Sequence, residues 1–194
     1  MDGINFTPFP VLATDRLLLR QIEMEDMNEF FLLKSDERLL SGYDAKSRSY
    51  EEAISKLREL NEDIDANVSI TWGITRKNEN RLIGSVCFWN IFPLLNKAEI
   101  GYELMTDWQG KGIMREAVKK IIDFGFGVMG LKVIEAVLNP DNLQSVKLLE
   151  INGFTGGTDL CAMDVSCDVF LKRRTYTLNV FDYCAENIIG QVIY

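Results

Sequence analysis

A glycine-rich segment in the middle of the chain has residue types and spacing suited to binding phosphate. Residues 109–114 (QGKGIM) stand between an expected strand and an expected helix. Glycine lets the backbone approach a ligand closely, and the first N–H groups of a helix are unpaired at its positive end. The segment matches neither the GxxxxGK[ST] nor the GxGxxG motif. On spacing alone, phosphate binding and a simple strand-to-helix turn are equally favoured.

The chain contains no histidine, which restricts its acid–base chemistry. Ser-His-Asp and Cys-His catalysis are excluded because both need an imidazole base, and so are His-containing zinc sites. Proton transfer near neutral pH must use carboxylates, Lys, Tyr, Cys, Ser or water. Glu99 and Glu103 are candidates because residues four apart on a strand project from one face, as does Gly101 between them. The alternative for each is an ordinary strand carboxylate paired with a Lys or Arg.

The composition is acidic, with 21 Lys and Arg against 29 Asp and Glu and a net charge of −8. This balance argues against nucleic-acid binding, which needs clustered basic residues, and favours a cationic substrate or partner. The length predicts one domain over residues 1–194, large enough to fold without disulfides or metal.

Three features predict a cytoplasmic protein with no membrane partner. The four cysteines lack CxxC spacing and are expected to be reduced thiols. The N-terminal sequence MDGINFTPFP has neither the basic nor the apolar region of a secretory signal. No apolar stretch reaches the roughly 18 residues that a membrane span requires.

The hydrophobic pattern predicts a mixed α/β domain. Strands are expected at residues 16–22, 68–76, 81–90, 97–105 and 132–138, with two more within 154–180. Helices are expected at residues 25–40, 50–64, 113–128 and 142–152. The polar turn KNEN indicates a hairpin between the second and third strands. The expected helix at 113–128 follows the glycine-rich segment directly, so that segment lies at a helix N-terminus.

Taken in order, four segments resemble the GNAT superfamily of N-acetyltransferases, and most of all its RimJ/RimL-like branch. The family's acetyl-CoA loop reads Gln/Arg-x-x-Gly-x-Gly/Ala, which residues 109–114 match except at Met114. The other matching segments are Thr14–Arg20 (TDRLLLR), Ala98–Tyr102 (AEIGY), and Asn142-x-x-Ser145-x-x-Leu148 followed by Gly153-Phe154. The resemblance covers residues 13–178, which leaves 179–194 as a C-terminal extension. Ile188, Ile189, Val192 and Ile193 in this extension could pack on the domain or on a second subunit.

This resemblance implies a GNAT-like acyl-CoA N-acyltransferase fold. Its central, mostly antiparallel sheet has about seven strands, splayed between the fourth and fifth, and about four flanking helices. Acetyl-CoA is the implied co-substrate, with its pantetheine arm in the gap, and no metal is implied. The residues implied to contact acetyl-CoA are Leu104, Met105, Gln109, Gly110, Lys111, Gly112, Ile113, Met114, Asn142 and Ser145. A solvated side chain is an equal alternative for Lys111, and Asn142 also suits a helix N-cap.

The resemblance also implies direct attack of an amine on the acetyl thioester in a ternary complex. It places a general base at Glu99, with Glu103 as the second candidate, because a carboxylate in a partly apolar cleft can have its pKa raised. Ser145 is the implied hydrogen-bond donor to the leaving thiolate. Many members place a Tyr where this chain has Leu149, which cannot donate a proton.

The implied activity is acetylation of a primary amine, most closely a protein N-terminal amine as in ribosomal-protein alanine acetylation. A small amine, such as a polyamine, an antibiotic or an amino-acid derivative, is the alternative acceptor. A non-catalytic acyl-CoA-binding module is an alternative of a different functional class. It stays possible because Leu149 stands where many members have a Tyr. Both a monomer and a homodimer are compatible with the sequence.

Overall fold

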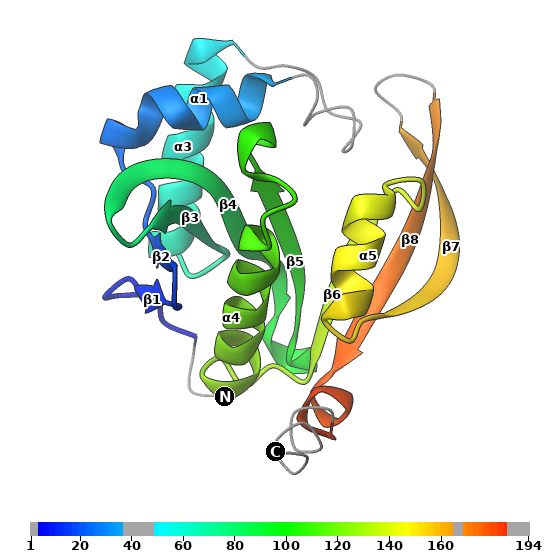
Figure 1. Ribbon diagram of the computed structural model, residues 1–194. Coiled ribbons are helices and arrows are strands. Elements are labelled where there is room, and N and C mark those ends of the chain that lie inside the picture. The colour runs from blue at the N-terminus through cyan, green and yellow to red at the C-terminus, as the bar shows by residue number, and fades with distance from the viewer. Residues whose placement is uncertain (1–3, 37–48, 165–168, 186–194) are drawn as a thin grey trace.

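The computed structural model describes residues 4–36, 49–164 and 169–185 (Figure 1). Eight strands form one mixed sheet in the order β1-β2-β3-β4-β5-β6-β8-β7. The strands are β1 (Leu12–Ala13), β2 (Leu17–Arg20), β3 (Ile70–Arg76), β4 (Glu79–Phe92), β5 (Lys97–Leu104), β6 (Val133–Leu138), β7 (Thr155–Asp164) and β8 (Val169–Asn179). The α-helices are α1 (Met27–Ser35), α3 (Tyr50–Asp65), α4 (Ile113–Gly127) and α5 (Leu143–Ile151). Short 3₁₀ turns occupy Met24–Asp26, Pro93–Leu95 and Thr106–Trp108.

The predicted mixed α/β fold is confirmed, with two differences at its edges. The sheet has eight strands rather than about seven, because the two-residue β1 pairs with β2 at the edge. The helix expected over 25–40 begins as a 3₁₀ turn, and α1 ends at Ser35; residues 37–40 lie outside the described chain. In the expected C-terminal extension a helical turn follows β8 through residue 185, and the four aliphatic residues singled out there also lie outside the described chain.

The sheet is open between β5 and β6, which are the only parallel neighbours among the described strands. These strands pair only where Lys97–Glu99 faces Val133–Glu135, and they diverge beyond that point (Figure 1). Each remains paired on its other side, β5 with β4 and β6 with β8. The backbone of β5 after Glu99 therefore presents a strand edge that β6 does not cover. This divergence is the predicted splay. It lies between the fifth and sixth strands rather than the fourth and fifth, because the short β1 is counted first.

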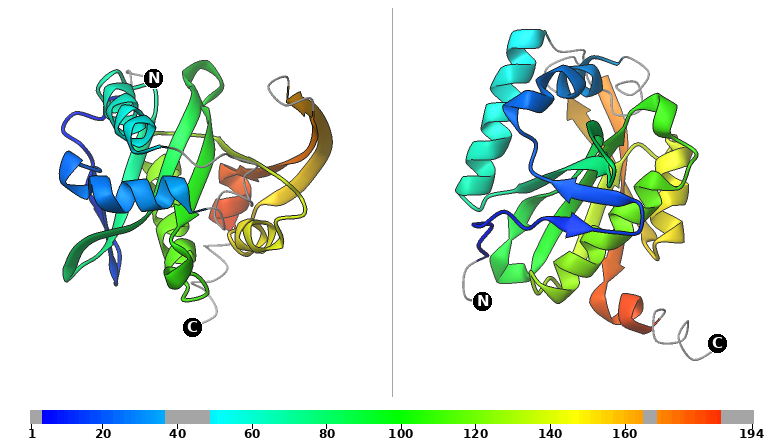
Figure 2. Two further views of the ribbon diagram at one scale, coloured as in Figure 1. Left: turned by 90° about the horizontal axis from the view of Figure 1, so that it is seen from above. Right: turned by 60° about the vertical axis from the view of Figure 1, so that its left-hand side comes forward.

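Helices cover both faces of the sheet, and the sheet separates two apolar clusters. On one side α4 packs against the sheet, where Phe124 contacts Trp72 with ring centroids 5.4 Å apart. On the other side α1 and α3 bury Phe30 and Leu57 against Leu82, and Figure 2 shows α3 and α4 on opposite sides. Residues alternate between the faces of a strand, which explains why Leu82 and its neighbour Ile83 belong to different clusters. Packing on the sheet fixes where the N-terminus of α4 lies.

Two structural features are absent from the described residues. No helix there combines the length and the apolar character needed to cross a membrane. The same residues contain no group of three or more His, Cys, Asp or Glu side chains placed to hold a metal ion.

Candidate active site

A cavity of about 580 Å³ lies where β5 and β6 diverge. Its lining comes from α1, α3, β3, β4, β5, β6 and the first turn of α5. Because the gap passes between two strands, residues from both faces of β5 reach this one cavity. Among them are Glu103 from one face and Tyr102 from the other, together with Ser145 of α5. Carboxylate and hydroxyl groups thus meet at the open edge of the strand.

Glu103 is held in place by two hydrogen-bond donors. The Lys34 ammonium lies 2.5 Å from its Oε1 atom, and the Ser85 hydroxyl donates to the same oxygen at 2.8 Å. The side chains of Glu103 and Lys34 are only 17% and 19% exposed. Ser85 faces Glu103 across the β4–β5 ladder, so strand pairing brings this donor into reach. The arrangement fixes the rotamer of Glu103.

Glu99 lies on the same face of β5 but outside the cavity lining. It pairs with Trp89 on β4, and its Oε1 accepts a hydrogen bond from the Asn90 side chain at 3.1 Å. The structure therefore brings Glu103, and not Glu99, into one cavity with Ser145.

Asn142 and Ser145 occupy the start of α5. The Asn142 side chain accepts the Ser145 N–H at 3.2 Å, which is an N-cap interaction. Ser145 is 8% exposed and lines the cavity. Leu149, one turn later, is completely buried in the main core, so it offers no hydrogen-bond donor to the cavity.

Tyr102 is a candidate that sequence reasoning missed. Its hydroxyl lies 3.4 Å from the carbonyl oxygen of Ser145, inside the same cavity. Burial raises the pKa of Tyr102 to about 12, so the phenol stays protonated at physiological pH and can donate a hydrogen bond. Strand alternation places it on the face opposite Glu103. The two side chains reach the same cavity only because β5 and β6 diverge. No local signal in the sequence indicates that divergence.

Cys87 lies on the cavity floor. A Cβ atom at Gly101 would come within 2.9 Å of its sulfur, so glycine is needed at that position. Burial raises the pKa of the Cys87 thiol to about 11. Because the thiolate is the nucleophilic form of cysteine, this thiol is unsuited to covalent catalysis.

The glycine-rich loop connects β5 to α4. Gly110 and Gly112 have φ angles of +71° and +72°, in the left-handed region that favours glycine. The Gln109 side chain donates to the Leu104 carbonyl at 3.0 Å, and the Met105 N–H donates to the Ile83 carbonyl at 2.9 Å. These contacts fix the turn where it leaves β5, and α4 begins at Ile113, directly after the second glycine.

The side chains next to the start of α4 do not cover the backbone N–H groups there. Ile113 and Met114 are buried in the core, so packing explains the methionine that departs from the Gly/Ala pattern. Lys111 places its ammonium 5.1 Å from the centroid of the Trp108 ring, a cation–π contact. The loop can therefore offer backbone N–H groups at the positive end of α4 to an anion.

Comparison with known proteins shows the family to which this chain belongs. The family model described as Acetyltransferase (GNAT) domain matches residues 16–155. The chain belongs to the GNAT acetyltransferase family. The Bacillus subtilis (strain 168) protein named Uncharacterized N-acetyltransferase YoaA is 35% identical over 147 residues, which cover 75% of this chain and 83% of the relative.

Two solved GNAT-like structures show the same fold. Ribosomal-protein-S5-alanine acetyltransferase from Vibrio fischeri has a TM-score of 0.76 and 25% identity, covering 90% of this chain and 98% of that one. Spermidine N-acetyltransferase from Vibrio cholerae, solved with CoA and spermine, has a TM-score of 0.76 and 22% identity, covering 88% and 99%. This GNAT protein is an acetyl-CoA-dependent N-acetyltransferase. The open edge of β5 and the N–H groups at the start of α4 fit the amide-bearing arm and the diphosphate of that co-substrate.

Proposed function

We propose that this GNAT enzyme acetylates the N-terminal amine of a protein, as the RimJ/RimL-like branch does, by direct transfer in a ternary complex. The observation that carries the transfer chemistry is one cavity holding the Glu103 carboxylate, the Tyr102 and Ser145 hydroxyls, and the uncovered edge of β5. The named S5-alanine acetyltransferase supports the acceptor class. A small polyamine is the second candidate, supported by Glu59 and Asp63, two carboxylates in the same lining.

Each group in the cavity has a distinct part in this proposal. Acetyl-CoA supplies an activated acetyl thioester. Glu103 receives, directly or through water, the proton that the acceptor ammonium must lose before its nitrogen can attack the thioester. Its position in the lining makes it a better candidate than Glu99. Ser145 and Tyr102 offer hydrogen bonds where the leaving thiolate forms. The backbone N–H groups of residues 110–114 hold the diphosphate, and the edge of β5 through Leu104 and Met105 pairs with the pantetheine arm.

Acetyl transfer and the acceptor class are tested together by following free thiol release. We expect acetyl-CoA to raise the melting temperature of the protein, because a ligand that binds only the folded state stabilises it. Peptides with free N-terminal Ala or Ser should release thiol faster than spermidine, aminoglycosides or amino acids, and N-formylated versions of the same peptides should release none. Faster turnover of spermidine would assign the enzyme to small amines, and a stable CoA complex without turnover of any acceptor would indicate a binding module.

Replacing Tyr102 with phenylalanine tests the donor that sequence reasoning missed. We expect kcat to fall about tenfold, the effect of losing one hydrogen bond to a developing charge, with the KM for acetyl-CoA unchanged. Because the pKa of Tyr102 is about 12, the loss should be uniform from pH 7 to roughly 10, a range over which an ordinary tyrosine begins to ionise. Ser145→Ala is the companion variant. An unchanged kcat in Tyr102→Phe, with a large loss in Ser145→Ala, would leave Ser145 as the donor.

A further inference from the structure

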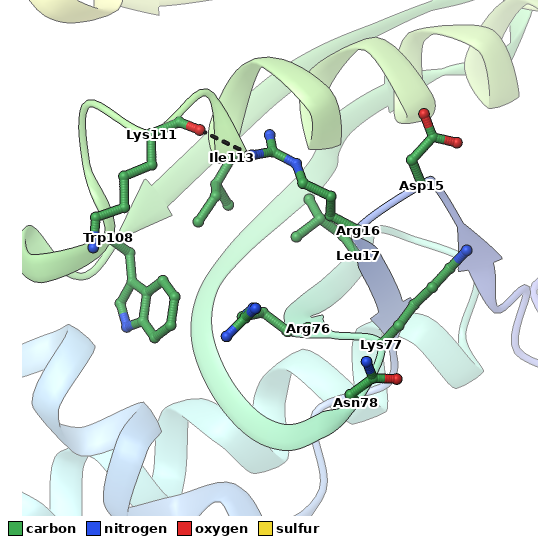
Figure 3. A pocket seen from close by; sticks show the side chains of 9 residues that line it. All are labelled: Asp15, Arg16, Leu17, Arg76, Lys77, Asn78, Trp108, Lys111 and Ile113. Atoms are coloured by element: carbon green, nitrogen blue, oxygen red, sulfur yellow. Dashed lines mark hydrogen bonds between the residues drawn. The ribbon is translucent and has the colours of Figure 1, made fainter.

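Arg16 connects the turn before β2 to the glycine-rich loop and the start of α4, which lie 95 and 100 positions later in the sequence. Its Nε donates to Glu116 Oε2 at 2.6 Å, and its Nη1 donates to the Lys111 carbonyl at 3.1 Å. Arg16 precedes β2, Lys111 belongs to the glycine-rich loop, and Glu116 lies in the first turn of α4. Figure 3 shows the guanidinium directed at the loop carbonyl. Arg16 and Lys111 both line a second cavity, of about 510 Å³.

The hydrogen bond to Lys111 determines which way a loop peptide faces. In a planar trans peptide the C=O and the following N–H point in opposite directions. Because the Lys111 carbonyl points at Arg16, the N–H of Gly112 points away from it. Lys111 lies between two glycines with positive φ angles, where the backbone can rotate at little steric cost. A peptide in this setting needs a partner to keep one orientation.

Glu116 holds the guanidinium where it can reach the loop. Besides the guanidinium contact, its carboxylate accepts the Arg16 backbone N–H at 3.0 Å and the Thr14 hydroxyl. Burial acts to raise the pKa of Glu116, but these hydrogen bonds and the Arg16 charge outweigh it and lower that pKa. The Thr14 oxygen in turn accepts the Leu17 N–H at 2.9 Å. The turn before β2 is thereby attached to α4 on both sides of Arg16.

We propose that Arg16 is a positioning residue for acetyl-CoA, because it holds the Lys111–Gly112 peptide with its N–H directed toward the diphosphate. This inference rests on the proposed function, in which residues 110–114 hold that diphosphate. Arg16 touches neither the acceptor cavity nor the reacting groups described above. Its loss should weaken the co-substrate's diphosphate interaction and leave the chemical step intact.

The test compares CoA with pantetheine, which lacks the diphosphate and the nucleotide. In Arg16→Gln we expect the Kd for CoA, measured by calorimetry, and the KM for acetyl-CoA to rise about tenfold, as for one lost hydrogen bond to a charged group. The Kd for pantetheine and the kcat/KM for S-acetylpantetheine should equal those of the unmodified enzyme, as should kcat and the amine KM at saturating acetyl-CoA. Arg16→Lys should retain most of the defect, because an ammonium lacks the guanidinium fork that contacts Glu116 and Lys111 together.

Lys77→Gln is the matched control, since Lys77 lines the same cavity from the β3–β4 turn and carries the same charge. It should change the Kd for CoA less than twofold, and a change as large as in Arg16→Gln would mean that charge alone matters. Equal weakening of CoA and pantetheine in Arg16→Gln would also overturn the positioning role. Failure of the proposed function gives a different result, because the unmodified enzyme would then bind pantetheine as tightly as CoA. Arg16 is 53% exposed, so its variants should fold, and melting temperatures verify this.

Discussion

Glu103→Gln is expected to lower kcat by about 10²–10⁴-fold, the range typical of a removed general base. Glutamine keeps the size of the side chain and can still accept hydrogen bonds from Lys34 and Ser85. It cannot take a proton from the acceptor ammonium. The KM for acetyl-CoA should stay within twofold, because Glu103 has no part in holding the co-substrate. Steady-state kinetics with saturating acetyl-CoA, across pH 6–10, would measure the loss and the accompanying change in the pH profile.

Two further variants show whether the effect belongs to Glu103. Glu135→Gln is the matched control, because Glu135 is also a strand carboxylate paired with a lysine, at 2.9 Å from the Lys97 ammonium. It should leave kcat within twofold. Glu99→Gln tests the other carboxylate that the sequence singled out. A larger loss in Glu99→Gln than in Glu103→Gln would transfer the role of base to Glu99.

Gly112→Val is expected to raise the KM and Kd for acetyl-CoA by about 10–100-fold, as hydrogen bonds to a charged ligand are lost. Gly112 has a φ angle of +72°, which a β-branched residue adopts only with strain. A Cβ atom there would make only an ordinary contact, 3.5 Å from the Arg16 guanidinium, so the strain lies in the backbone. The loop must therefore rearrange, and its N–H groups would no longer converge. Calorimetry with CoA measures the affinity.

Gly127→Ala provides the control at the opposite end of α4. A Cβ atom at Gly127 has no neighbour within 4 Å, and alanine favours a helix by about 1 kcal/mol over glycine. This variant should bind CoA normally and melt at the same temperature or slightly higher. Gly112→Val should lose about 1–2 kcal/mol of folding stability. Unchanged CoA affinity in Gly112→Val would contradict the assignment of the loop to the diphosphate.

The class of fold and the glycine-rich loop that we propose holds the co-substrate could be predicted from the sequence because their signals are local. Alternating and helical hydrophobic patterns predicted the strands and helices that flank the loop, and residues 109–114 carried the family motif. The absence of histidine directed attention to carboxylates and hydroxyls, and the cavity between β5 and β6 is lined by residues of both kinds. The boundaries were less accurate, as α1 shows, because a helix end depends on local capping and on the packing around it.

Which residues line the candidate site was decided by the tertiary structure. Glu99 and Glu103 share one strand face, and only the divergence of β5 and β6 brings the second into the cavity while Glu99 binds Asn90. The same divergence joins Tyr102 from the opposite face to Ser145. Arg16 and Glu116 meet across 100 positions of sequence. Periodicity within a segment specifies which face a side chain occupies, whereas contacts between distant segments depend on how whole elements pack, and packing is a property of the folded chain.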